Sequence, residues 1–236
     1  MEYLNKNRNT SLLFAAFFLT AIYGFFKTYF GLFPTFSPQI TLITHLHGVS
    51  VTLWLLMCIA QPLLIRYKKR QWHIRLGQFS YFFVPILALV MVMTIHQGYV
   101  RGKGHIPQEA LLAFQFVPLS TFAMFVVTYI LAMLHRHNRL AHRSYLIVNV
   151  IVLLSAAFGR LNYGWLGISG LVPSVTAAYM ASNLLLLCMM IIEWWQGRAN
   201  RVYIGSFVAL MVITAFYYYG TTGMLWQSIA KFIFGA

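Results

Sequence analysis

Seven long runs of apolar residues follow one another along the chain and constrain its fold more than any other feature. Each run holds about 18 residues or more, and apolar segments of that length predict membrane-spanning helices. The runs are continuously apolar and do not alternate, which favours helices over the strands of a membrane β-barrel. The sequence therefore predicts an all-α integral membrane bundle of seven transmembrane helices. The predicted spans are Ser11–Phe33, Thr44–Ile65, Leu76–Gly98, Ala110–Leu134, Ser144–Leu161, Val175–Trp195 and Val202–Tyr219.

The rest of the sequence leaves no room for a soluble domain. Only 8% of the residues are charged, against about 25% in soluble domains. We expect a single membrane domain over residues 1–236, with a short cytoplasmic N-terminal segment over 1–10 and a C-terminal tail over 224–236, of which Met224–Phe234 is amphipathic. The first apolar run is long and no clear small-residue cleavage site follows it, so we expect a first helix and not a cleaved signal peptide.

The basic residues, which give the chain a formal net charge of +14, gather on one side of this topology. If the N-terminus is cytoplasmic, 12 of the 17 lysines and arginines fall in cytoplasmic segments, which is the positive-inside pattern. We therefore predict a multi-pass protein of a bacterial-type plasma (inner) membrane, with its C-terminus outside. The charge needs no nucleic-acid partner, because it would attract anionic lipids at the cytoplasmic face. The twelve residues are Lys6, Arg8, Arg66, Lys68, Lys69, Arg70, Arg75, Arg136, Arg139, Arg143, Arg198 and Arg201.

Histidine is almost the only side chain left for proton, metal or haem chemistry. The chain has eight histidines, no aspartate and three glutamates, which are Glu2, Glu109 and Glu193. This composition argues against an enzyme built on paired carboxylates. Neutral imidazole is a common ligand of haem iron and of transition metals. The histidines are thus the first candidates for a cofactor site.

His47 and His96 form the leading candidate pair. His47 lies 19 residues from Arg66, which corresponds to roughly 28 Å along a helix, and His96 lies 21 residues from Arg75, roughly 31 Å. Both side chains are therefore expected near the outer edge of the hydrocarbon, on successive helices. This depth favours one b-type haem or a transition metal bound by both imidazoles, with Arg160 neutralising a haem propionate. The alternative is that each histidine forms hydrogen bonds to a neighbouring helix.

Polar residues inside the predicted spans indicate a seam that faces the bundle interior. Arg160 could form an ion pair with Glu109 or bind an anion. His73 and His142, at the cytoplasmic boundary, are candidates for a second haem or metal site, and the alternative is that they are ordinary boundary residues beside arginines. The remaining candidates for lining a pocket are Trp54, Gln61, Glu109, Gln115, Asn149, Tyr163 and Asn183.

Two short segments combine histidine with arginine and a small or apolar residue. The first is His73–Gly77 (HIRLG), and the second runs from His142–Arg143 (HR) to Arg160–Leu161 (RL). These segments resemble a family of uncharacterised bacterial multi-spanning membrane proteins, whose pattern is HR-x-x-G followed by HR and a later Arg-Leu. The chain departs from that pattern by Ile74, which separates the first histidine from its arginine. The resemblance covers the second to fifth spans and implies that the two histidines, the glycine and Arg160 belong to one arrangement, without implying an activity.

The chain is also similar in layout to cytochrome b561-type proteins, which carry histidines at both membrane faces. Those proteins have a histidine on each of four core helices. Here the fourth span has histidines only at or beyond its inner end, and the fifth has none at its outer end. The layout therefore argues against two complete bis-histidine haems.

Three hypotheses about function follow. The leading one is a redox protein that holds one b-type haem or metal near the outer face and takes electrons from membrane quinol, since a one-electron cofactor needs no protein carboxylate. The second is a non-enzymatic carrier, receptor or sensor with an outer-facing pocket for a small apolar or anionic molecule. The third is an accessory subunit of a larger membrane complex or a homo-oligomer, in which the histidines are structural. Recognition in the second hypothesis would fall to Arg160, Gln115, Asn183 and Tyr163.

Overall fold

The protein is all-α in the part of the chain that the structure describes. The computed structural model describes the backbone over residues 2–36, 40–167 and 171–235, and the side chains over 8–36, 40–161, 165–167 and 174–235. Within these ranges the chain forms eight α-helices, one short 3-10 helix and no strand. The helices are α1 (Glu2–Phe25), α2 (Leu42–Arg66), α3 (Arg70–Gly102), α4 (Gln108–Leu134), α5 (Arg139–Trp165), α6 (Leu171–Trp195), α7 (Arg201–Gly220) and α8 (Met224–Phe234).

Six of these helices are long and apolar enough to cross a membrane, which is the property expected of a multi-pass membrane protein. The membrane-crossing segments of the described residues correspond to the second to seventh predicted spans. They are Leu42–Arg66, Arg70–Gly102, Gln108–Leu134, Arg139–Leu161, Ser174–Trp195 and Arg201–Gly220.

The first predicted span differs from the helix that forms there. The apolar run reaches Phe33, whereas α1 ends at Phe25 and a turn follows, in which the Tyr29 N–H donates to the Phe25 carbonyl at 2.8 Å. The 3-10 helix Phe30–Leu32 then leads towards α2. Apolarity defined the predicted run, and the aromatic side chains of this turn are as apolar as those of a helix, so hydropathy could not locate the helix end.

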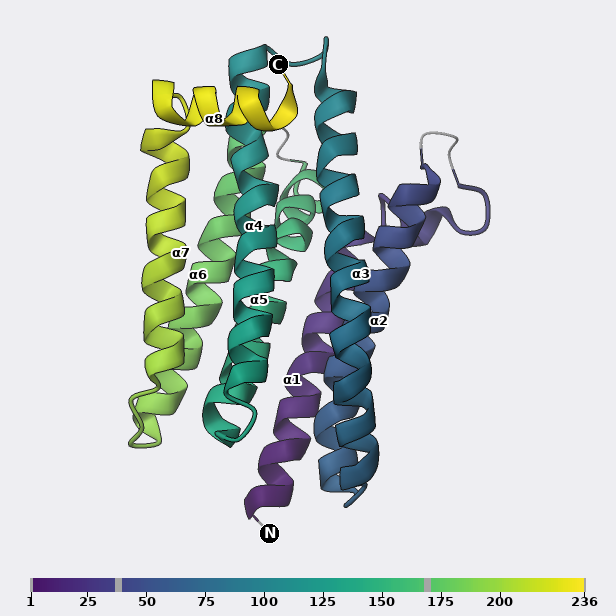
Figure 1. Cartoon of the computed structure of the whole chain (residues 1–236), viewed down its shortest axis with the longest axis vertical. Helices are drawn as coiled ribbons and strands as arrows, with labels where there is room; N and C mark the ends of the chain where they lie inside the picture. Colours follow the sequence, from purple (N-terminus) through teal and green to yellow (C-terminus); the bar gives the residue numbers. More distant parts are fainter. Residues whose placement is uncertain (1, 37–39, 168–170, 236) are drawn as a thin grey trace. The chain divides into compact units, whose positions relative to one another are not determined.

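The chain divides into two compact units, Met1–Thr94 and Ile95–Ala236. In the first unit α1 packs along α2 (Figure 1). Trp54, Leu55 and Cys58 form the buried side of α2. Both α2 and α3 continue as helices through an internal proline, Pro62 in one and Pro85 in the other. The single membrane domain over residues 1–236 stays a prediction.

The second unit is built around α5, which packs against α4, α6 and α7. In the most apolar 18-residue stretch of α5, 56% is buried, whereas the corresponding share for α7 is 17%. Gly159 brings α5 close to α6, because a Cβ at this position would lie 3.1 Å from the Ser174 carbonyl oxygen. The side chains of Asn138 and Asn200 cap the first turns of α5 and α7. The α5 helix is thus the core of this unit, and it carries the buried polar residues Ser144, Asn149 and Ser155.

The short α8 helix lies across the end of α4 and α7 (Figure 1). Trp226 is buried there, and its indole N–H donates to the Leu112 carbonyl of α4 at 2.9 Å. The last turns of α3 join this contact. The cluster consists of Ile95, Tyr99, Leu111, Leu112, Trp226, Ala230 and Phe234.

Candidate functional site

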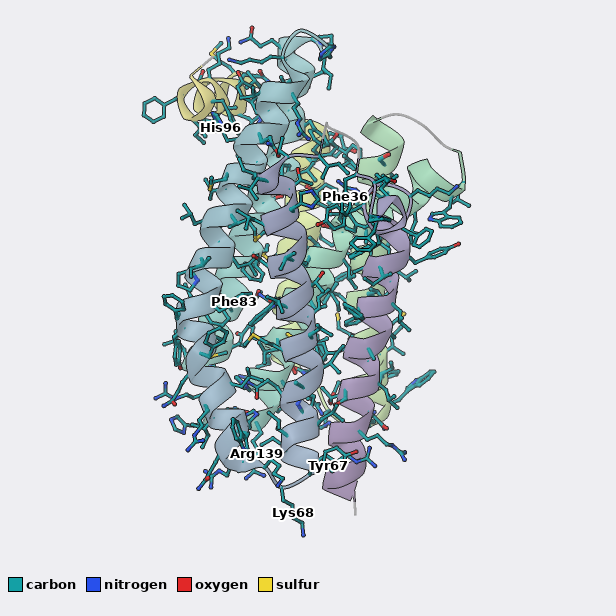
Figure 2. The ribbon with its side chains drawn as sticks, turned by 90° about the vertical axis from the view of Figure 1, so that its right-hand side faces the viewer. Phe36, Tyr67, Lys68, Phe83, His96 and Arg139 are labelled. Atoms are coloured by element: carbon teal, nitrogen blue, oxygen red, sulfur yellow. The ribbon has the colours of Figure 1, made fainter. Side chains whose placement is uncertain are left out.

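The two histidines of the leading candidate pair belong to different compact units. His47 is a half-buried residue of α2 in the first unit. His96 is exposed and lies on α3 in the second unit, on the stretch of helix that packs against α8 through Ile95 and Tyr99 (Figure 2). The shared haem or metal site therefore stays a prediction. Among the described residues, no group of three or more His, Cys, Asp or Glu side chains could hold a metal ion.

His45 lies two residues before His47. Aromatic side chains of the first unit surround it, in a cluster that the sequence did not predict. The Tyr29 hydroxyl lies 3.0 Å from the His45 Nδ1 atom, and the Phe36 ring packs edge-on against the imidazole with centroids 4.6 Å apart. Phe36 lies at the opposite end of this unit from Tyr67 and Lys68 (Figure 2). Burial raises the pKa of the Tyr29 phenol, which therefore keeps its proton and can donate it to His45.

Gly48 makes that aromatic cluster fit against α2. A Cβ at Gly48 would lie 3.0 Å from the Cζ atom of Tyr29. A glycine in a helix allows a close approach of neighbouring groups, and at Gly48 the group that approaches is the Tyr29 ring. No sequence signal would have found this partner, because Tyr29 lies in a turn whose path depends on packing.

His73 and Gly77, two members of the family-like motif, both face Gln61 on α2. The His73 Nδ1 atom is 3.3 Å from the Gln61 backbone carbonyl. With the Gln61 side-chain amide oriented to satisfy its neighbours, its oxygen accepts from the Gly77 N–H at 3.1 Å and its nitrogen donates to the His73 carbonyl at 3.2 Å. The motif therefore joins the start of α3 to the end of α2 within the first unit. Trp54, another predicted pocket residue, is buried on α2.

His142 and Asn149 attach α5 to α4 in the second unit. The His142 Nδ1 atom is 2.7 Å from the Ala132 carbonyl in the last turn of α4. The Asn149 amide is fully buried and donates both to the Phe125 carbonyl at 2.8 Å and to the Thr128 hydroxyl at 3.0 Å. These two positions were predicted to share an interior face, and their contacts show that this face meets α4.

Arg160, near the other end of α5, has a local contact. Its guanidinium donates to the Ala156 carbonyl at 3.1 Å, one turn back on the same helix. Glu109 is exposed at the start of α4, and the pair Arg160–Glu109 is not among the ion pairs of the described residues. The other alternative, that Arg160 binds an anion, stays a prediction. The side chain of Tyr163 lies outside the described residues.

A buried ion-pair cluster at the other end of α5 is the largest feature that the sequence did not predict. Glu193 of α6 accepts from Arg143 at 3.1 Å and from Arg198 at 2.7 Å, and it is only 6% exposed. Beside it, the Asn200 amide donates to the Ser144 hydroxyl at 2.8 Å. The sequence grouped Arg143 with a solvated basic loop. The sequence feature that could have indicated this cluster is a lone carboxylate, Glu193, at the end of a predicted helix and near several arginines.

A narrow hollow lies among α4, α5, α6 and α7, entirely within the second unit. It is open to the outside and has a volume of about 10 Å³, which is room for little more than one water molecule. Hydroxyl side chains come from three of the helices, and the Tyr179 hydroxyl lies 3.4 Å from that of Ser120. The lining consists of Ser120, Thr121, Met124, Val152, Ser155, Tyr179, Ser182, Leu210 and Ile213. None of these residues is charged, so the hollow suits a neutral molecule.

Asn183, a predicted recognition residue, lies one turn along α6 from Tyr179 and is 9% exposed. Its amide nitrogen donates to the Tyr179 carbonyl at 3.0 Å and to the Thr214 hydroxyl at 3.2 Å. Its Oδ1 atom is buried and has no hydrogen-bond partner among the described residues. Gln115, the other predicted residue of this set, is fully buried on α4. Of the predicted recognition residues, Asn183 is the one adjacent to the hollow.

No protein-family model, characterised protein or solved structure matches this chain.

Proposed function

We propose that this protein is a carrier, receptor or sensor of a bacterial inner membrane that binds a small neutral molecule among α4–α7, where the water-sized hollow must widen to admit it. The observation that carries the proposal is the composition of that hollow, which combines hydroxyl groups with apolar side chains and contains no charge. Sites for small molecules have this composition, with a few placed polar groups in an apolar wall. Because the lining carries no charge, we favour a neutral ligand over an anionic one.

The hydrogen bonds already made inside the hollow define the polar group of the ligand. Ser182 donates its hydroxyl proton to the Ala178 carbonyl at 2.9 Å, and Ser120 donates to the Val117 carbonyl at 3.0 Å. Their oxygens are left as acceptors. The Asn183 Oδ1 atom, one turn away, is a further acceptor. A ligand with a hydroxyl donor, such as a long-chain alcohol or a quinol, would match these acceptors once the helices move apart, although the Ser120 oxygen already has the Tyr179 hydroxyl 3.4 Å away.

Photolabelling tests this site. The probe is octanol carrying a diazirine on its chain, applied to the full protein in lipid vesicles, and the matched control probe is the corresponding alkane without the hydroxyl. We expect adducts on the hollow-lining segments of α4 and α7. The substitution Ser182→Leu fills the hollow and removes an acceptor, so it should lower this labelling about tenfold, the equivalent of about 1.4 kcal/mol. Equal labelling by both probes, or adducts spread over the outward-facing residues, would contradict the proposal.

The topology is part of the same proposal. Six helices have membrane-crossing length, and α1 (Glu2–Phe25) supplies a seventh apolar helix, of 24 residues. With the N-terminus in the cytoplasm, the basic segments between the helices fall on the cytoplasmic side, where anionic lipids would be attracted to them. Cysteine accessibility at Lys68 and Lys103 distinguishes the two orientations. Labelling of position 68 only from the cytoplasmic side, and of position 103 only from the outside, is expected.

Haem or metal binding is the second candidate function, and one observation favours it. The His142 Nδ1 atom lies 2.7 Å from the Ala132 carbonyl oxygen. An imidazole held in this way carries its proton on Nδ1 and presents the lone pair of Nε2, as ligating histidines do. Such a cofactor would supply one-electron chemistry, with quinol as a donor.

The visible spectrum of the purified protein tests this second candidate. A Soret band with sharp α and β bands after dithionite reduction would establish a b-type haem. Replacement of His47, His96, His73 and His142, one at a time, would then identify its ligands. A featureless spectrum from protein that also contains no transition metal would exclude this candidate.

A further inference from the structure

The α8 helix has two apolar faces, of which the protein covers only one. Trp226, Ala230 and Phe234 recur every four residues and are buried against α4 and the end of α3. A second face, here called the outer face of α8, carries Leu225, Ile229, Phe232 and Ile233. These four side chains are exposed, Phe232 at 89% and Leu225 at 70%. This helix of 11 residues therefore buries three apolar side chains and exposes four others on its outer face.

The polar residues of α8 lie on a third face. Gln227 and Lys231 are one turn apart, and Ser228 lies beside them. Gln227 is fixed there, because its amide donates to the Thr221 carbonyl at 2.8 Å and to the Glu109 carbonyl at 3.2 Å. The division into a protein-facing, an apolar and a polar face means that α8 cannot rotate without exposing Trp226 or breaking its hydrogen bond to Leu112.

The place of α8 in the chain decides what covers its outer face. The helix begins four residues after α7 ends at Gly220, and a three-residue connection extends at most about 10 Å. It therefore lies at the level where a membrane-length helix ends. At about 16 Å it is too short to cross a membrane itself. The α7 helix also exposes apolar side chains, among them Val212 and Tyr219.

We propose that α8 lies in the plane of the membrane surface and inserts its outer face, Leu225–Ile229–Phe232–Ile233, among the lipid acyl chains of the leaflet in which α7 ends. Amphipathic helices with an apolar and a basic or polar face bind at this depth. Lys231 on the polar face extends towards the headgroups, where it is attracted to phosphate oxygens. The helix thereby fixes the height of α4 and α7 in the bilayer, because Trp226 joins it to α4.

Fluorescence quenching of the full protein in phosphatidylcholine vesicles tests this proposal. Cys58 and Cys188 are first replaced by alanine, and single cysteines are then introduced by Phe232→Cys, Ile229→Cys and, as the matched control on the polar face, Ser228→Cys. Each is labelled with a nitrobenzoxadiazole dye. Lipids brominated at carbons near the headgroup should quench positions 229 and 232 about twofold more than position 228, since these probes sit among the acyl chains.

Two results would overturn the proposal. Strong quenching of position 232 by aqueous iodide would place the outer face in water. Protection of position 232 from both iodide and brominated lipid would mean that protein, either a second copy of this chain or a different partner, covers the face. The two labelled apolar positions serve as independent measurements, so the failure of one variant to fold leaves the other.

Discussion

The two compact units use different means to hold their helices together. The second unit, Ile95–Ala236, contains both ion pairs of the described residues and buries the amides of Asn149, Asn183 and Asn200. In the first unit, the described buried polar side chains are hydroxyls, and its named interhelical contacts join half-buried groups such as the Gln61 amide and the His45 imidazole. Apolar burial gives little driving force between helices in lipid, so small residues and polar contacts decide which helices pair. The second unit is therefore expected to be the more rigid of the two.

The largest loss of stability should come from disrupting the ion-pair cluster of the second unit. Replacement of Glu193 by Gln leaves Arg143 and Arg198 without their carboxylate in a largely buried place, which should cost about 3 kcal/mol of stability. The midpoint of thermal unfolding in mild detergent measures this loss. The matched control is Glu109→Gln, because Glu109 is exposed and its change should lie within about 0.5 kcal/mol. Equal midpoints for the two variants would show that the cluster does not stabilise the unit.

A smaller difference in stability is expected between substitutions of the two interhelical amides, Asn149 and Gln61. Asn149→Leu removes two buried hydrogen bonds to α4, and such bonds between membrane helices contribute about 1 kcal/mol. Gln61→Leu in the first unit should cost less, because Gln61 is half-buried and water or headgroups can replace its contacts. Proteolysis of each unit in detergent, followed over time, measures both variants. Relative to the unmodified protein, a larger increase in cleavage within residues 1–94 for Gln61→Leu than within 95–236 for Asn149→Leu would reverse the comparison.

The smallest effect is expected at a glycine of the first unit. Gly48→Ala introduces a Cβ 3.0 Å from the Tyr29 ring, so the ring must shift and its hydrogen bond to His45 should weaken. The cost of about 1 kcal/mol for this crowding is partly offset by the higher helix propensity of alanine. Gly205→Ala on α7 is the control, since nothing lies within 4 Å of its added Cβ, and it should stabilise the protein slightly. Two variants that stabilise equally would mean that the Tyr29 ring moves freely.

The locations of the helices were predictable because they depend on local composition. Long apolar runs must form helices in lipid, where each backbone polar group needs an internal partner, and six of the seven predicted spans coincide with helices of membrane-crossing length. The exception, the end of α1 at Phe25, depends on how an aromatic turn packs. The interior positions of Asn149 and Asn183 were also predictable, because an amide facing lipid would have no partner.

The partners of those side chains were not predictable, because they come from segments far apart in the chain. Helical periodicity shows that His142 and Asn149 share a face, and only the packing of α5 shows that this face meets Ala132 and Phe125. The same holds for Glu193, which sequence composition marks as rare but which becomes a buried ion-pair centre only because Arg143, fifty residues earlier, lies against it. The sequence by itself determined that the chain is helical, apolar and poor in carboxylates, since these properties follow from residue type and spacing. Only the tertiary structure decided which polar groups meet and where a hollow is left among α4–α7, because those features depend on how neighbouring helices rotate and pack against one another.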